Sequence, residues 1–348
     1  MLEAKRPLIA LAAETTTRLN LEELSELATS NLVLVIAAGR ARALGHNTLF
    51  PPETMLAFRL RREDLTPERL RGLADPTAPQ LVKSLSDTVA IPMDGNVAVD
   101  MVKQSRLLPA LLIGQTTPAE ASRLAQAGYP SVRAEDVTAQ LNLVPAVERI
   151  TETVLPIAAS STAKIVVYRS LADGSENLAL VVGTPRTRSE PLVRVHSACF
   201  TGDVLGSLRC DCGPQLHRAV ERMAEEGSGI VLYLDQEGRG IGITNKLRSY
   251  LLQDQGLDTL EANHLLGWED DARNFGLAAA ILKDLGIRRI RLMSDNPTKL
   301  ESLSKFGILV QSRVELTIPP NGTNDRYLET KTRRCGHLRE QKGTRRTG

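Results

Sequence analysis

The chain has 348 residues, which is enough for two domains that each bury a hydrophobic core. Its hydrophobic fraction of 42%, charged fraction of 24% and net charge of +2 are those of an ordinary globular protein and give no general attraction for nucleic acid or a membrane. Because no apolar run is long enough to span a bilayer and the first residues lack a signal-peptide pattern, we expect a cytoplasmic protein.

Residues 1–145 alternate helical and strand patterns, which predicts an α/β domain. Helical spacing of apolar residues predicts helices at 21–27, with Asn20 as N-cap, and at 97–105 and 118–127. Short apolar runs predict strands at 32–37, 55–60 and 107–113. This part contains no cysteine and no phosphate-binding glycine loop.

A change to small and polar residues at 151–164 indicates a domain boundary, and we expect the second domain to cover 146–338. Its first predicted elements are strands at 165–168 and 178–182, joined by the turn LADGSEN. The last ten residues, 339–348, are rich in lysine and arginine and poor in apolar residues, so we expect a disordered basic tail.

Three of the four cysteines, Cys199, Cys210 and Cys212, lie in one stretch, RVHSACFTGDVLGSLRCDCG at 194–213. A cytosolic chain has little reason to cluster thiols unless they bind a metal or react. Thiolates favour zinc, and three protein ligands would leave a fourth position for water, as in catalytic zinc sites. The spacing alone leaves two alternatives open, namely a structural zinc with a distant fourth ligand and buried free thiols.

After the cysteines, a helix is predicted at 215–226 and a strand at 230–234, followed by the loop QEGRGIG at 236–242. Such a glycine loop lets backbone N–H groups approach a phosphate, with Arg239 adding a charged fork, although a plain tight turn uses the same residues. A helix from Thr244 is followed by a helix at 275–285, a strand at 290–293 and a helix start at 296–299.

The motifs RVHSACFTGD, RCDCG, DQEGRGIG and KLRSYLLQDQGLDTLEANHLLG occur in this order, and together they resemble the GTP cyclohydrolase II family of riboflavin biosynthesis. The resemblance extends from about Val147 to His337. It implies one zinc ion per subunit on the three cysteines, which activates a water for attack on C8 of the guanine ring. It further implies release of formate and diphosphate to give 2,5-diamino-6-ribosylamino-4(3H)-pyrimidinone 5′-phosphate, magnesium with the GTP triphosphate, and a homodimer.

By this resemblance, Tyr250 assists at the water near the metal, and Arg273 acts at the α-phosphorus with Asp271 as its proton acceptor. Because arginine is normally protonated, stabilisation of the leaving diphosphate is an equal alternative to a nucleophilic role for Arg273. The remaining matched positions are expected to contact GTP: Arg194, Val195, His196, Ser197, Ala198, Gln215, Glu237, Gly238, Arg239, Thr259, Ser294 and Lys299.

Two positions depart from the family pattern. The family typically has glutamate where Ala198 stands, so a carboxylate is missing beside the first cysteine, while Ser294 replaces a frequent threonine and keeps the hydroxyl. A non-catalytic zinc module that binds GTP or RNA is therefore the alternative to an active enzyme. A zinc nucleobase deaminase fits poorly, because the chain has neither a His-x-Glu nor a Cys-x-x-Cys signature.

The first domain resembles 3,4-dihydroxy-2-butanone 4-phosphate synthase through AAETTTRLNLEELSELA and AVDMVKQSRLLPALLIG. The acidic magnesium-binding loop expected before Ala12 is missing, and Asn96 stands near the place of a metal-binding histidine. Glu14 remains, but one carboxylate does not make a site for a hard cation. We therefore expect a degenerate domain without synthase activity, retained for a structural or regulatory role.

Overall fold

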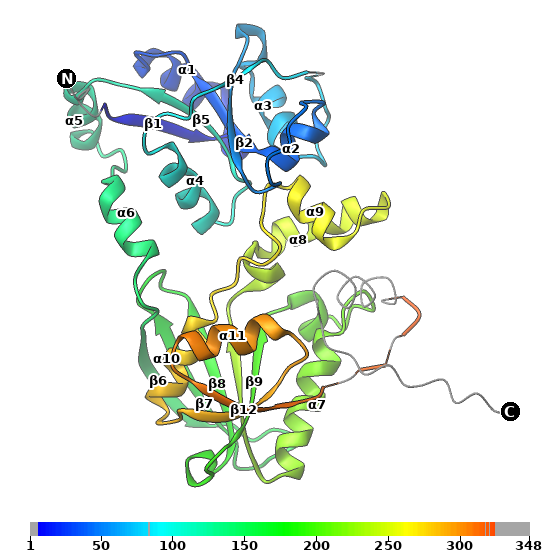
Figure 1. Cartoon of the computed structure of the whole chain (residues 1–348). Helices are drawn as coiled ribbons and strands as arrows, with labels where there is room; N and C mark the ends of the chain where they lie inside the picture. Colours follow the sequence, from blue (N-terminus) through cyan, green and yellow to red (C-terminus); the bar gives the residue numbers. More distant parts are fainter. Residues whose placement is uncertain (1–5, 83, 317, 320, 324–348) are drawn as a thin grey trace, which may run out of the picture. The chain divides into compact units, whose positions relative to one another are not determined.

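The computed structural model describes residues 6–323 except positions 83, 317 and 320, so the predicted tail at 339–348 lies outside the described residues. The chain forms two compact units (Figure 1). The first comprises the chain up to Asn142 together with Ile241–Ala272, and the second comprises Leu143–Gly240 and the chain from Arg273 onward. The two sheets with their helices confirm the mixed α/β fold class predicted from the sequence.

The first unit is built on a five-stranded sheet with strand order β1-β5-β2-β3-β4, in which every pairing is antiparallel. The strands are β1 (Leu8–Ala12), β2 (Val33–Ala37), β3 (Met55–Arg59), β4 (Thr88–Val89) and β5 (Ala110–Gln115). The helices are α1 (Arg18–Leu27), α2 (Ala38–Ala43), α3 (Pro67–Ala74), α4 (Gly95–Gln104), α5 (Pro118–Gln126), α6 (Ala134–Leu141), α8 (Gly242–Asp254) and α9 (Thr259–Leu265).

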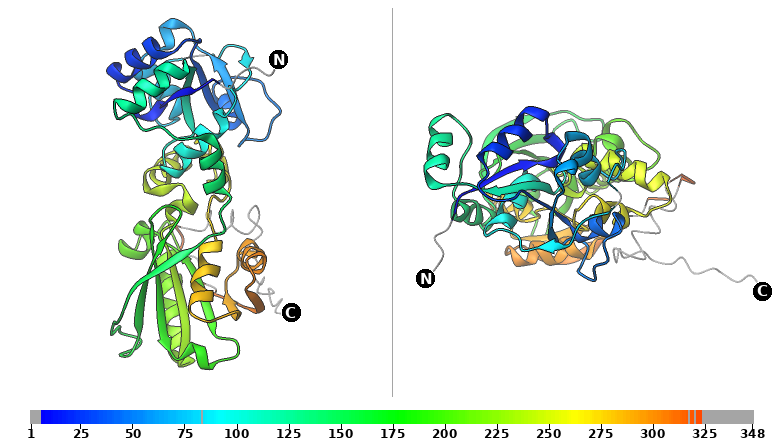
Figure 2. Two further views of the ribbon diagram at one scale, coloured as in Figure 1. Left: turned by 90° about the vertical axis from the view of Figure 1, so that its left-hand side faces the viewer. Right: turned by 90° about the horizontal axis from the view of Figure 1, so that it is seen from above.

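The central strand β2 is buried on both faces because its side chains alternate between two cores. Leu34 and Ile36 pack with residues of α1, α2, α3, α8 and α9, whereas Val35 packs with Val99 and Val102 of α4. Figures 1 and 2 show the ribbon of this sheet with its helices. The continuous apolar run at 32–37 is therefore the signature of a strand that is covered on both sides.

The expected N-cap of α1 is wrong by one turn. Thr17 is the N-cap, and its hydroxyl accepts the backbone N–H of Asn20, whose own side chain accepts the backbone N–H of Thr17. This reciprocal capping box fixes the helix start at Arg18, three residues before Leu21, the first buried position of the helix.

Residues 241–272 pack with the first unit, although the sequence-based boundary places them in the second domain. Apolar side chains of α8, α9 and their flanks lie in the same core as α1, α2 and α3, namely Ile241, Leu252, Ala262, Leu266 and Trp268. The assignment of domains by family stays a prediction.

The second unit is built on a seven-stranded sheet with strand order β12-β11-β9-β10-β8-β7-β6. The strands are β6 (Val147–Val154), β7 (Lys164–Ser170), β8 (Glu176–Gly183), β9 (Leu192–Ser197), β10 (Ser228–Leu234), β11 (Arg289–Met293) and β12 (Leu309–Val314). Strands β9 to β12 pair in parallel, and β6, β7, β8 and β10 pair antiparallel. Helices α10 (Gly276–Asp284) and α11 (Pro297–Lys305) contribute to one core of this unit and α7 (Cys212–Glu225) to another.

Within the described part of the chain, none of the helices combines the length and the apolar character that crossing a membrane requires.

Candidate functional site

The parallel strands β9, β10 and β11 carry the candidate site at their carboxyl ends. Ser197, the last residue of β9, is in register with Leu234, the last residue of β10. The guanidinium of Arg194 on β9 donates to the carbonyl of Met293 at the end of β11, with Nη1 and O 3.1 Å apart. The loops that follow these strands therefore leave the sheet at one edge, where ligands bind in open α/β sheets.

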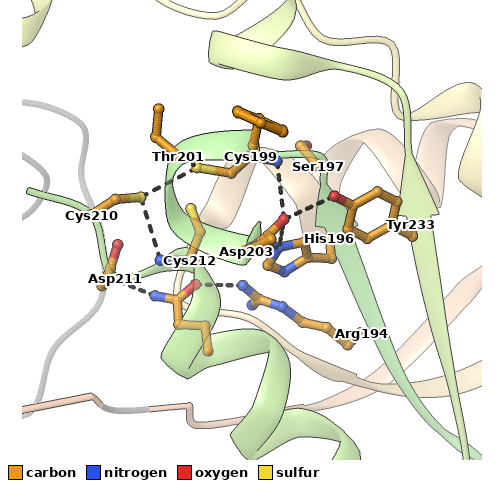
Figure 3. Close-up of polar contacts among 12 residues, drawn as sticks. Arg194, His196, Ser197, Cys199, Thr201, Asp203, Cys210, Asp211, Cys212 and Tyr233 are labelled. Carbon is orange, nitrogen blue, oxygen red and sulfur yellow. Dashed lines mark hydrogen bonds and ion pairs between the residues drawn. The ribbon is translucent and has the colours of Figure 1, made fainter. Parts of the chain in front are cut away.

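The three cysteines predicted to bind zinc come together at this edge (Figure 3). Their sulfur atoms all lie within 4.8 Å of one another, and those of Cys199 and Cys210 are 3.5 Å apart. Cys199 precedes the turn Phe200–Val204, and Cys212 begins α7. Three sulfur donors grouped in this way fit a zinc ion with one position left for another ligand.

Gly202 makes room for the sulfur cluster. A Cβ at this position would lie 3.0 Å from Cys199 Sγ and 3.2 Å from Cys210 Sγ, which is closer than ordinary van der Waals contact. The backbone of the turn thus passes directly over the sulfur atoms because residue 202 has no side chain.

Hydrogen bonding and burial favour the neutral form of the Cys210 thiol. The hydrogen bond with Cys199, together with burial, raises the pKa of the Cys210 thiol to about 11. A divalent cation reverses this preference because it deprotonates the thiols that coordinate it. The Cys210 thiol therefore stays neutral near neutral pH and gives up its proton when it coordinates a cation.

Asp203 is a site residue that the sequence analysis missed. Its carboxylate accepts the backbone N–H of Cys199 at 3.0 Å and the hydroxyl of Tyr233 at 3.0 Å, and it contacts His196 Nε2 at 3.1 Å (Figure 3). Burial lowers the pKa of His196, so the ring is neutral near neutral pH and donates its Nε2–H to Asp203. The only signal in the sequence was a carboxylate four residues after a predicted ligand.

A second series of hydrogen bonds connects Arg194 of β9, which is predicted to contact GTP, with the beginning of α7. Arg194 Nη2 donates to Gln215 Oε1 at 2.6 Å, and Gln215 Nε2 donates to Asp211 Oδ2 at 2.7 Å. Asp211 lies between Cys210 and Cys212. Arg194 and Gln215, predicted as GTP contacts, are thus joined directly to the cysteine loop.

Two positively charged side chains lie over one aromatic ring at this edge of the sheet. The Arg273 guanidinium carbon lies 4.9 Å from the centroid of the Phe275 ring, and Lys299 Nζ lies 5.6 Å from it. Lys299 Nζ also donates to the carbonyl of Val195 at 2.8 Å, and Arg273 Nη1 is 3.4 Å from Ser197 Oγ. Because both positive charges are held beside the end of β9, they suit a phosphate-bearing ligand.

The turn after β10 is strained. Glu237 accepts the backbone N–H of Phe200 at 2.6 Å, which ties the turn Glu237–Gly240 to the cysteine loop. Gly238 and Arg239 both have left-handed backbone angles, with φ of 63° and 62°. A left-handed arginine costs conformational energy, and such strain clusters at functional sites.

The other residues that were predicted to belong to the site are divided between the two units. In the second unit, Ala198 donates its backbone N–H to the carbonyl of Leu234 at 2.8 Å, and Ser294 is almost fully buried after β11. Tyr250 on α8, Thr259 at the start of α9 and Asp271 belong to the first unit. Their predicted roles stay predictions.

Comparison with known proteins decides the family. A family model for GTP cyclohydrolase II matches residues 148–315. The chain is 40% identical over 312 residues to GTP cyclohydrolase-2 of Azospirillum brasilense, which covers 87% of this chain and 81% of that protein. The chain belongs to the GTP cyclohydrolase II family. The predicted resemblance is thereby confirmed, and membership makes the chain a hydrolase.

Other relatives of the chain are named as proteins of riboflavin biosynthesis. The riboflavin biosynthesis protein RibBA of Bacillus subtilis (strain 168) is 50% identical over 198 residues, which is 57% of this chain and 50% of that protein. A solved structure of RibBX, a two domain 3,4-dihydroxy-2-butanone 4-phosphate synthase from A. baumannii, was also found. The alignment covers 91% of this chain and 93% of the RibBX chain. Its 16% identity and TM-score of 0.31 do not establish a shared fold.

Proposed function

We propose that the chain is a zinc-dependent GTP cyclohydrolase II, which opens the imidazole ring of GTP and releases formate and diphosphate. The product would be 2,5-diamino-6-ribosylamino-4(3H)-pyrimidinone 5′-phosphate. The observation that carries the proposal is the group of three cysteine sulfurs within 4.8 Å of one another in a GTP cyclohydrolase II family member. Magnesium with the triphosphate, a homodimer and a cytoplasmic location belong to the proposal through the family likeness.

Cys199, Cys210 and Cys212 would hold the zinc, which when bound supplies Lewis-acid activation of water near neutral pH. Asp203 accepts the Cys199 backbone N–H at 3.0 Å and so orients this ligand's loop. Tyr250, whose proposed role rests on the family likeness, would move a proton during ring opening.

The charged residues at the strand ends would bind GTP. The Glu237 carboxylate suits the N–H edge of guanine. Because this carboxylate accepts the backbone N–H of Phe200, a bound guanine would compete with that N–H for the carboxylate. Lys299 and Arg239 suit the phosphates. The remaining contacts proposed for GTP come from Arg194, Val195, His196, Ser197, Ala198, Gln215, Gly238, Thr259 and Ser294.

Arg273 would act on the triphosphate by charge. Arginine stays protonated in proteins, and a preorganised guanidinium stabilises negative charge that develops on a leaving diphosphate. The contacts of Arg273 with the Phe275 ring and Ser197 Oγ help to fix the position of its guanidinium. Asp271 would be the acceptor if Arg273 instead loses a proton and attacks the α-phosphorus.

The test is to incubate the full chain with GTP, magnesium and zinc and to follow formate and diphosphate by NMR. Cys210→Ser should lose both bound zinc and formate release, whereas Cys335→Ser removes the one cysteine outside the cluster and should keep both. A wild-type protein that binds zinc and GTP but releases no formate would support the second candidate, a non-catalytic zinc module. Ala198, which stands where the family typically has glutamate, is the observation that favours this candidate.

A further inference from the structure

Arg248 on α8 is held by three side chains of the first unit. Its Nη2 donates to Glu14 Oε1 at 2.8 Å, its Nε lies 2.9 Å from Asp75 Oδ2, and its Nη1 donates to Asn245 Oδ1 at 2.8 Å. The side chains of Arg248 and Glu14 are 16% and 17% exposed, and that of Asp75 is 8% exposed. All three nitrogens of the guanidinium thus have an acceptor in surroundings that exclude most water, where the fork geometry of arginine is most selective.

The partners of Arg248 are fixed in turn. The second oxygen of Glu14 accepts the backbone N–H of Leu108 at 2.8 Å. The second oxygen of Asp75 accepts the backbone N–H and the hydroxyl of Thr77 at 2.8 and 2.7 Å. Since both carboxylates are held at both oxygens, they offer Arg248 one position and not a range of positions.

Glu14 has a use here that differs from the one its sequence context suggests. It lies in the stretch that resembles a metal-dependent synthase, where a carboxylate would serve a hard cation. In this structure its two oxygens are occupied by Arg248 and the Leu108 N–H. The carboxylate, which lies just after β1, therefore connects α8 to the segment that precedes β5.

Close backbone packing supports the same connection. A Cβ on Gly39 of α2 would lie 2.5 Å from the carbonyl oxygen of His264 on α9. A Cβ on Gly242, at the start of α8, would lie 3.1 Å from the Cβ of Arg106. These approaches leave no room for the α8–α9 segment to shift against the rest of the unit.

The loop after α9 is tied down as well. Trp268 is buried in the core of the first unit, and the next residue, Glu269, forms an ion pair with Lys103 of α4. Asp270 contacts His264 Nε2 at 2.7 Å. The three residues that precede Asp271 are thus anchored within the first unit.

We propose that Arg248 is a positioning residue for GTP hydrolysis and that the first unit is the scaffold it works through. Arg248 fixes α8 through Glu14 and Asp75, and α8 carries Tyr250. Residues two apart on an α-helix are separated by about 200°, so Tyr250 lies on the side of α8 opposite to these contacts. The inference rests on the proposed catalytic role of Tyr250.

The test compares Arg248→Lys and Glu14→Gln with the wild-type chain. A misplacement of about 1 Å can cost about 100-fold in rate, so we expect kcat for formate release to fall by roughly 10- to 100-fold. The zinc content should change little, because the cysteines belong to the second unit, and the KM for GTP should change less than kcat, because most of the proposed GTP contacts also belong to that unit. Amide hydrogen exchange should become faster in residues 242–254, which measures the anchoring of α8 independently of activity.

Glu22→Gln is the matched control, because it removes an exposed ion pair with Arg18 on α1 of the same unit. It should keep the wild-type kcat and the wild-type exchange of α8. If Arg248→Lys does not fold, Glu14→Gln still tests the inference, since Asp75 and Asn245 continue to hold Arg248.

The outcomes distinguish the positioning role of Arg248 from the proposed function of the chain. An active wild-type chain whose Arg248→Lys and Glu14→Gln variants keep full kcat overturns the positioning role alone. Loss of zinc in parallel with kcat also overturns it, because the effect would then be general unfolding. A wild-type chain that releases no formate overturns the proposed function, and the positioning role with it.

Discussion

The carboxylate of Asp203 lies 3.0 Å from the backbone nitrogen of Cys199, inside a network that also includes His196 and Tyr233. The contact fixes the backbone of a proposed zinc ligand from a residue that does not itself join the sulfur cluster. Asp203 is almost fully buried, with a 4% exposed side chain, so this arrangement does not depend on solvent. It is the relation expected between a metal ligand and the residue that orients it.

Asp203→Asn should weaken zinc binding or formate release by about 10- to 100-fold, because outer partners of metal ligands are worth about that much. The amide can accept only through one oxygen and presents its N–H₂ to donors, so it cannot serve all three partners. Zinc affinity by competition with a chromogenic chelator measures the effect. Asp173→Asn makes the same chemical change at an exposed turn of the same unit and should leave zinc affinity unchanged.

Ala198→Glu should lower the KM for GTP. The family typically has glutamate at this position, and a carboxylate beside Cys199 can accept an N–H of the substrate. A hydrogen bond to a charged group contributes about 1.5–3 kcal/mol, which corresponds to a change of roughly 10- to 100-fold. Steady-state formate release against GTP concentration measures KM, and an unchanged or higher KM would show that this carboxylate has no role in binding here.

Arg273→Ala should slow diphosphate release on the order of 100-fold while zinc content stays at the wild-type level, because the charge acts on the triphosphate and not on the metal. Arg289→Ala removes an exposed arginine of β11 and should have no effect. Arg273→Lys separates the two proposed roles, since partial activity indicates electrostatic stabilisation and complete loss indicates a nucleophile. Release of all products at the wild-type rate by Arg273→Ala would remove this residue from the mechanism.

His196 should make the metal-stripped protein sensitive to acid. Burial lowers its pKa in the folded state below the ordinary value of 6.5, so the unfolded chain binds a proton at a higher pH than the folded chain does. The contribution to stability is therefore present above about pH 6.5 and is lost as the pH falls through the lowered folded pKa. Urea unfolding near neutral pH and near pH 5 should show a larger loss in the wild type than in His196→Gln, and equal losses would contradict the assignment.

Local pattern predicted much of the site because the chemistry is written in short motifs. Cys199, Cys210 and Cys212 could be found from their spacing, and the end of β10 followed from the apolar run at 230–234. The start of α1 was missed because Thr17 and Asn20 exchange two hydrogen bonds that no apolar periodicity records.

The long-range relations could not be predicted in the same way. Arg248 and Glu14 are 234 residues apart in the chain, and nothing in either segment specifies the other. The packing of 241–272 into the first unit likewise depends on the shape of a core that forms only in three dimensions. Asp203 was missed because its role arises from three donors brought together by a turn and two strands.

Zinc dependence can be measured by returning zinc to the metal-stripped protein while formate release from GTP is followed. We predict no formate without zinc, a rise in proportion to added zinc, and saturation at about one zinc ion per chain. Formate release that does not depend on zinc, or its absence from a chain saturated with zinc, would contradict this prediction.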